Sequence, residues 1–240
     1  MTVVGAGGKT STIIILVQEM ISKRLLITTT THFTEFTQFF NKEVMGADAV
    51  KIINEIDDIW QQKPKQKIVV GKERINYDSE LANYKIKGIS PTLVDNFKLI
   101  FSDCNILVEG DGSAGKPIKV PASYEPVVPA KTDILIPVLG MSGLGTEIND
   151  QHCHRLKQLR GLTDKNIIDQ ELIVKILTSV DSYGYYQKKI KNYIPILNQV
   201  SESNLSRVKK IAFDLVEKGI PKVIITNTLR PNPVLKVVQR

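Results

Sequence analysis

Near its N-terminus the chain reads Gly5-Ala6-Gly7-Gly8-Lys9-Thr10-Ser11, between a short apolar run and a helical pattern. Glycines let a backbone bend so that several N–H groups point at one anion, and the following helix adds the positive end of its dipole. A lysine there reaches the β- and γ-phosphates of a nucleotide, and the next hydroxyl is a Mg²⁺ ligand. We therefore expect ATP or GTP to be bound by Gly5, Gly7, Gly8, Lys9, Thr10 and Ser11.

The match to the usual pattern of such a loop, G-x-x-x-x-G-K-[ST], is incomplete, because the first glycine position falls on Val3. The shorter spacing G-x-x-G-K-T remains, with Gly5 supplying the turn. This shorter spacing is the one seen in Mur-type ligases. The alternative interpretation is a glycine-rich turn that only joins a strand to a helix.

Composition and charge argue against a nucleic-acid-binding, disulfide-rich or membrane-spanning protein. The 240 residues carry a net charge of +7, but the lysines are scattered, so we expect no nucleic acid among the partners. The two cysteines, Cys104 and Cys153, form no disulfide framework and indicate a reducing compartment. No apolar run approaches the roughly 18 residues of a membrane span, and we expect no signal segment. We expect a cytoplasmic protein without membrane contact.

Strand-like and helical patterns alternate along the chain. Strands are expected at residues 2–4, 24–29, 67–70, 105–108, 134–139, 193–197 and 222–226. Helices are expected at residues 10–22, 91–102 and 204–218, with a helical or irregular segment at 33–40. This alternation predicts an α/β fold with a mostly parallel sheet and helices on both faces. Residues 1–240 are expected to form a single domain, with the mainly helical segment 150–186 as a lobe over the site.

Two carboxylates follow the strand predicted at 105–108, namely Glu109 and Asp111. Ligands of parallel sheets bind beyond the carboxyl ends of the strands, where the glycine loop, residues 28–32 and Asn198 are also expected. Carboxylates there hold Mg²⁺ directly or through water, and Mg²⁺ neutralises charge on a transferred phosphoryl group. We expect Thr10 with Glu109 or Asp111 to bind Mg²⁺, and Lys9 and Asp111 to be catalytic. The alternative is that Asp111 merely opens a turn.

Four other side chains are candidates for contact with a second substrate: His32, Lys116, His154 and Arg155. Lys116 and Lys119 lie in a long proline-containing loop, which is either functional or a stiff surface crossover. His154 belongs to the run His152-Cys153-His154, whose donor atoms also suit a thiophilic metal ion. Because a structural zinc site normally needs four ligands, we favour a contact with substrate or phosphate.

Asn198 follows the strand predicted at 193–197 and is expected to line a pocket for the nucleotide base. Many GTPases carry Asn-Lys-x-Asp at this place, and the aspartate accepts hydrogen bonds from guanine. Gln199 and Ser201 replace the lysine and the aspartate here, so selectivity for guanine is not supported.

Together these segments resemble the YqeC family. The resemblance is carried by residues 4–11, 28–32, 108–113, 116–122 and 152–155, which recur in order across most of the chain. It implies a P-loop NTPase-like fold, a three-layer sandwich. It also implies a role as an accessory or selenium cofactor biosynthesis protein for selenium-dependent molybdenum hydroxylases. The implied partners are a molybdenum hydroxylase or the proteins that mature its cofactor.

The residues and the resemblance lead to one main hypothesis, a Mg-nucleotide-hydrolysing accessory protein. A phosphotransferase or Mur-like ATP-dependent ligase for a small molecule is the alternative that the G-x-x-G-K-T spacing favours. A scaffold without nucleotide affinity is a third.

Overall fold

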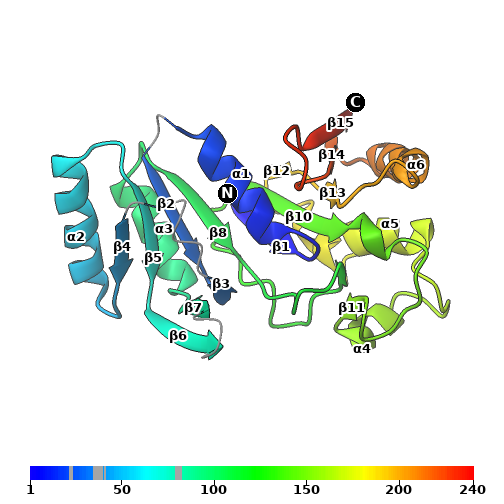
Figure 1. Cartoon of the computed structure of the whole chain (residues 1–240), viewed down its shortest axis with the longest axis horizontal. Coiled ribbons are helices and arrows are strands. Elements are labelled where there is room, and N and C mark those ends of the chain that lie inside the picture. Colours follow the sequence, from blue (N-terminus) through cyan, green and yellow to red (C-terminus); the bar gives the residue numbers. More distant parts are fainter. Residues whose placement is uncertain (22–23, 35–39, 41, 79–82) are drawn as a thin grey trace. The chain divides into compact units, whose positions relative to one another are not determined.

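The computed structural model describes residues 1–21, 24–34, 40, 42–78 and 83–240 (Figure 1). The chain forms two compact units. The first consists of residues 1–2, 10–112 and 127–132, and the second of residues 3–9, 113–126 and 133–240.

The first unit contains a parallel sheet in the order β8-β2-β5-β4 and a three-stranded antiparallel sheet in the order β3-β7-β6. Its strands are β2 (Leu25–Thr29), β3 (His32–Thr34), β4 (Lys42–Met45), β5 (Lys67–Gly71), β6 (Glu73–Asp78), β7 (Asn83–Lys87) and β8 (Asn105–Glu109). Its helices are α1 (Lys9–Glu19), whose first residue belongs to the second unit, α2 (Ala49–Gln62) and α3 (Pro91–Ile100).

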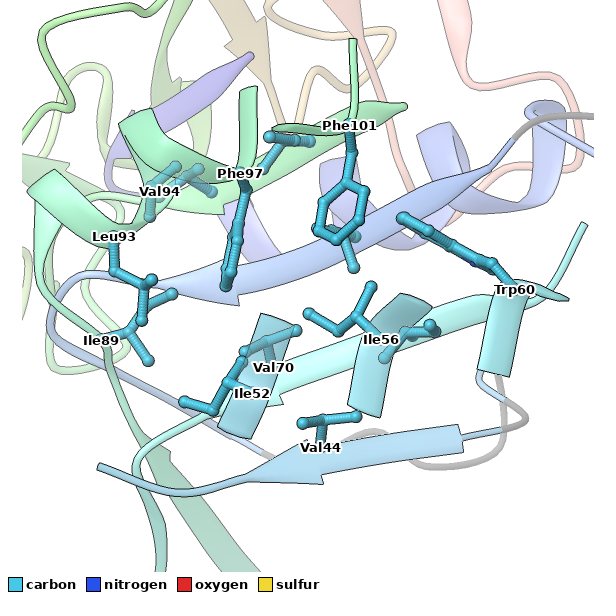
Figure 2. Close-up of a cluster of buried hydrophobic side chains, with 14 residues drawn as sticks. Val44, Ile52, Ile56, Trp60, Val70, Ile89, Leu93, Val94, Phe97 and Phe101 are labelled. Carbon is cyan, nitrogen blue, oxygen red and sulfur yellow. The ribbon is translucent and has the colours of Figure 1, made fainter. Parts of the chain in front are cut away.

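Helices α2 and α3 share one apolar core with the parallel sheet of the first unit (Figure 2). Ile52, Ile56 and Trp60 are buried on α2 at a spacing of four residues, which places them on one face of the helix. The Trp60 ring meets the ring of Phe101 edge-on, with centroids 5.1 Å apart. On β2, by contrast, three successive residues from Leu25 to Ile27 are buried, so both faces of the sheet are covered.

The second unit has a sheet in the order β15-β14-β13-β10-β1, in which β12 also pairs with β10. The pairs of β10 with β12 and β13, and of β13 with β14, are parallel, and β15 is antiparallel to β14. Its strands are β1 (Thr2–Gly5), β9 (Ile118–Lys119), β10 (Ile134–Gly140), β11 (Cys153–His154), β12 (Asn192–Tyr193), β13 (Ile196–Asn198), β14 (Lys222–Thr226) and β15 (Val234–Gln239). Its helices are α4 (Leu156–Arg160), α5 (Gln170–Thr178) and α6 (Leu205–Glu217), with 3₁₀ turns η2 (Met141–Gly143) and η3 (Tyr183–Tyr186).

The predicted α/β class with a mostly parallel sheet and helices packed against it is confirmed. The strand predicted at 193–197 is divided between β12 and β13, and the segment 150–186 holds only short helices among turns. Helix α2, strand β4, the β6–β7 pair and strand β15 were not predicted. Most of the segment expected at 33–40 lies outside the described residues. None of the described helices is both long and apolar enough to cross a membrane.

Replacement of Phe97 by alanine tests the core of the first unit. Phe97 is 0% exposed at the centre of the cluster in Figure 2, so Phe97→Ala should lower the free energy of unfolding by about 3–5 kcal/mol. The control residue Leu99 lies two residues away on the same helix and is 63% exposed. Leu99→Ala should therefore change the free energy of unfolding by less than about 0.5 kcal/mol. Urea unfolding of both variants measures the difference, and equal effects would contradict the packing described.

Candidate functional site

The glycine loop joins β1 to α1, as the sequence predicts. Strand β1 ends at Gly5 and helix α1 begins at Lys9. Gly7 and Gly8 have φ angles of +76° and +123°, which L-residues with side chains rarely adopt. A Cβ on Gly8 would lie 2.2 Å from Asn198 Nδ2, and one on Gly7 would lie 2.4 Å from the backbone of Gly140. The loop therefore requires glycine at both positions.

Two amides of the loop hold it in place within the second unit. The N–H of Ala6 donates to Val138 O at 2.8 Å, and the N–H of Gly7 donates to Lys116 O at 3.1 Å. The first N–H groups of a helix have no acceptor within the helix itself. Anion binding at this loop would therefore use amides of the first turn of α1 and not those of Ala6 and Gly7.

Lys9 folds back over the loop from the start of α1. Its side chain is 4% exposed, and Nζ donates to Gly5 O at 2.9 Å and to Ser113 Oγ at 3.1 Å. A buried ammonium group needs polar neighbours, because desolvation of a charge is costly. The structure thus places a lysine ammonium against the backbone of a glycine loop.

Asn198, at the end of β13, uses its side chain to fasten the loop. Its Nδ2 donates to Gly7 O at 2.8 Å and to Thr228 Oγ1 at 3.1 Å. Its Oδ1 accepts from Thr226 Oγ1 at 2.9 Å and from the N–H of Thr228 at 3.1 Å. An asparagine amide has two donor hydrogens and an oxygen that accepts two bonds, so its capacity is fully used. In this structure, the side chain of Asn198 positions the glycine loop.

In the first unit, the expected metal-binding side chains Thr10 and Glu109 lie together. Thr10 Oγ1 donates to Glu109 Oε2 at 2.9 Å, and Thr29 Oγ1 donates to Glu109 O at 2.8 Å. Glu109 and Asp111 are both buried. The carboxyl ends of β2 and β8 are register partners, Thr29 opposite Glu109, as expected for neighbouring parallel strands. This arrangement offers a hydroxyl and a carboxylate to one hard cation.

The candidate contacts for a second substrate are distributed over both units. In the first unit, His32 is exposed on β3, in the three-stranded sheet. In the second unit, Lys116 contacts the glycine loop through its backbone carbonyl. His154 lies on β11, opposite Lys119 of β9, and Arg155 follows it with a φ of +67°.

Lys119 does not face a ligand in the second unit. Its side chain is 0% exposed, and Nζ lies 2.9 Å from Glu125 Oε2. Arg155 Nε donates to the other oxygen of the same carboxylate at 3.1 Å, and its guanidinium lies over the Tyr124 ring. These groups tie the segment after Ser113 to β11, and they give that part of the long loop an ordered internal structure.

A metal site made of protein side chains alone is absent from the part of the chain that the structure describes. No group of three or more His, Cys, Asp or Glu side chains is placed to hold a metal ion there. Burial raises the pKa of the Cys153 thiol to about 11, so this thiol is protonated at neutral pH and is a poor nucleophile.

Some residues of the site were not selected from the sequence. Ser113 contacts Lys9, Thr228 contacts Asn198, and Gly140 lies against Gly7. The run Gly140-Met141-Ser142-Gly143 follows a predicted strand, so its glycines were a usable signal. Thr228 had no local signal, because only the fold brings it to Asn198.

Comparison with known proteins identifies the family. The sequence model of the YqeC protein family matches residues 1–157. The chain belongs to the YqeC family. It is 30% identical over 166 residues to the uncharacterized protein YqeC of Escherichia coli strain K12, an alignment that covers 68% of this chain and 60% of that protein. No solved structure matches the chain.

Glu125 should make the stability of the protein depend on pH. Burial raises the pKa of its carboxyl, but Lys119, the Ala122 N–H and Arg155 outweigh this effect and hold the pKa below its ordinary value of 4.5. A lowered pKa in the folded state stabilises the protein above pH 4.5, and this stabilisation is lost as the pH falls through the folded-state pKa. The wild type should therefore lose stability in that acidic range.

The test is urea unfolding of Glu125→Gln at pH 7 and pH 3. At pH 7 the variant should lose about 3 kcal/mol, because Lys119 keeps a buried charge without its carboxylate partner. At pH 3 the difference from wild type should shrink. Glu217→Gln, at an exposed position of α6, is the control and should differ little from wild type at either pH. A pH-independent loss in Glu125→Gln would refute the charged pair.

Proposed function

We propose that this YqeC family member binds a nucleoside triphosphate at the glycine loop and hydrolyses it with Mg²⁺. The observation that carries the proposal is the position of Lys9. This residue is the first of helix α1, directly after the glycine loop, and its ammonium group donates a hydrogen bond to Gly5 O. A helix N-terminus and a lysine ammonium together suit the β- and γ-phosphates. The nucleotide is ATP or GTP.

Mg²⁺ would be held by Thr10 with Glu109, in a site that the phosphates complete. Mg²⁺ in proteins is typically bound by one or two carboxylates plus substrate phosphates, not by a cage of side chains. The Thr10–Glu109 contact fits that description, and Asp111 is the second carboxylate available on the same segment. Thr10 directly follows Lys9 in the chain, so the residues proposed for the phosphates and for Mg²⁺ are neighbours in the sequence. The metal would neutralise charge on the phosphates during transfer.

We further propose that the hydrolysis serves maturation of the cofactor of a selenium-dependent molybdenum hydroxylase. The chain belongs to the YqeC family, and this role is the one that the resemblance of its motifs to that family implies. The side chains of His154 and Arg155, with the Lys116 segment, would face the hydroxylase or its maturation proteins. An accessory protein of this kind should hydrolyse nucleotide slowly until its client is present.

A second candidate is a Mur-like ligase or a phosphotransferase for a small molecule, which the G-x-x-G-K-T spacing favours. The two candidates differ in what stimulates turnover. A small-molecule enzyme would consume nucleotide rapidly with a metabolite alone, whereas an accessory protein would respond only to its protein client. Phosphate release measured with a metabolite panel and with a purified hydroxylase distinguishes them.

Lys9→Ala tests the phosphate loop. Loss of a charge-assisted contact should weaken ATP or GTP binding by about 30-fold, which corresponds to about 2 kcal/mol. Isothermal titration measures the dissociation constant. Lys209→Ala removes the same charge from an exposed position of α6 and should bind as the wild type does. If Lys9→Ala binds ATP and GTP as tightly as the wild type does, the glycine loop is not the phosphate-binding site.

Glu109→Gln tests the metal site. The variant keeps the size of the side chain but loses the negative charge, so the gain in nucleotide affinity that Mg²⁺ gives should fall by about tenfold. Affinities measured with Mg²⁺ and with a chelator give this gain for each variant. Glu55→Gln, at an exposed position of α2, is the control and should keep the full gain. An unchanged Mg²⁺ effect in Glu109→Gln would exclude this carboxylate as a ligand.

A further inference from the structure

The glycine loop of the second unit is covered on its Gly7 side. A Cβ on Gly7 would lie 2.4 Å from Gly140 N and 2.9 Å from Pro117 O. Gly143, in the turn after β10, is likewise packed against Pro117 and Ile118. Backbone and apolar side chains therefore pack closely against this side of the loop.

The Gly8 side of the loop is bounded by the turn that follows β14. A Cβ on Gly8 would lie 2.2 Å from Asn198 Nδ2 and 3.7 Å from Thr228 Oγ1, so Asn198 and Thr228 both border this side. Thr228 is fastened to the loop through Asn198, which contacts Gly7 O with the same amide nitrogen. The turn and the loop are thus parts of one hydrogen-bonded assembly within the second unit.

The turn after β14 is braced throughout. The N–H of Asn227 donates to Pro233 O at 2.8 Å, and the N–H of Arg230 donates to Asn227 O at 3.1 Å. The side chain of Asn227 accepts from the N–H of Leu229 and donates to Val200 O, each at 3.1 Å. Hydrogen bonds therefore brace the backbone on both sides of Leu229.

This braced turn presents a bulky apolar side chain to solvent. Leu229 is 89% exposed, and it directly follows the residue that Asn198 holds beside the glycine loop. Ligand sites combine apolar side chains with a few polar groups in fixed positions, and a wall that is rigid before binding loses little entropy when the ligand arrives. An apolar side chain next to a residue that borders the glycine loop suits the flat face of a nucleobase.

We infer that the turn 227–230 is the nucleoside-binding wall of this protein, with Leu229 packed against the base of the nucleotide whose phosphates Lys9 holds. The inference rests on the proposed function and adds to it the residues that recognise the nucleoside. Thr228 joins the two parts of the site, because it contacts Asn198 and borders Gly8.

The experiment compares binding of ATP, GTP and inorganic tripolyphosphate to the full chain and to Leu229→Ser. Tripolyphosphate carries the phosphates without the nucleoside. Leu229→Ser should weaken the better-bound nucleotide by about tenfold, because apolar contact with the base is lost. Its affinity for tripolyphosphate should stay that of the wild type. Val180→Ser, which replaces another exposed apolar residue of the second unit (69% exposed), should change neither affinity.

The outcomes separate this inference from the proposed function. If wild type and Leu229→Ser bind the nucleotide equally well, the inference about the nucleoside-binding wall is wrong, while the proposed phosphate-binding role of the loop is unaffected. If wild type binds tripolyphosphate as tightly as ATP and GTP, the nucleoside adds nothing to binding, and the inference about the nucleoside-binding wall is again wrong. Wild-type protein that binds none of the three ligands overturns both. Thermal unfolding of Leu229→Ser should match the wild type, since the side chain is in solvent.

Discussion

The second unit depends on one constraint, the passage of the chain at Gly8 within contact distance of the Asn198 amide. No side chain larger than hydrogen fits at Gly8, since a Cβ would lie 2.2 Å from Nδ2. The amide reaches Gly7 O only when the loop lies this close, and it also bonds Thr226 and Thr228 at the end of β14. A buried amide with missing partners would destabilise the fold, so Asn198 links the stability of the loop to that of the strand end and the turn.

The first unit depends on a different kind of interaction, apolar packing of α2 and α3 on a parallel sheet. The buried side chains of this core also fix the carboxyl end of β8, where Glu109 meets Thr10 and Thr29. A carboxylate in such a place needs hydrogen bonds, because burial disfavours its charge. Polar chemistry at the strand end is therefore supported by the apolar packing behind it.

The sequence predicted buried strands better than it predicted edges and exposed helices. Strands such as β5, β8 and β14 are continuous apolar runs bounded by polar residues, a local signal that survives in the fold. Helix α2 was missed although Ile52, Ile56 and Trp60 repeat at helical spacing after the capping residue Asp48. Charged and polar residues stand between these apolar residues, so the helix has no long apolar run, and its four-residue period is the main local signal. Strand β15 is half exposed at a sheet edge, and its pairing with β14 stabilises it.

The sequence by itself determined the glycine loop, its lysine and hydroxyl, and the α/β class, because these follow from local chain stiffness and from the apolar period. Only the tertiary structure decided the partners. It placed Ser113 on Lys9 and Thr228 on Asn198, and it turned Lys119 inward onto Glu125. Contacts between residues far apart in the chain depend on how strands are ordered in the sheet. Local propensities do not encode that order, whereas packing and hydrogen bonding of the whole fold do.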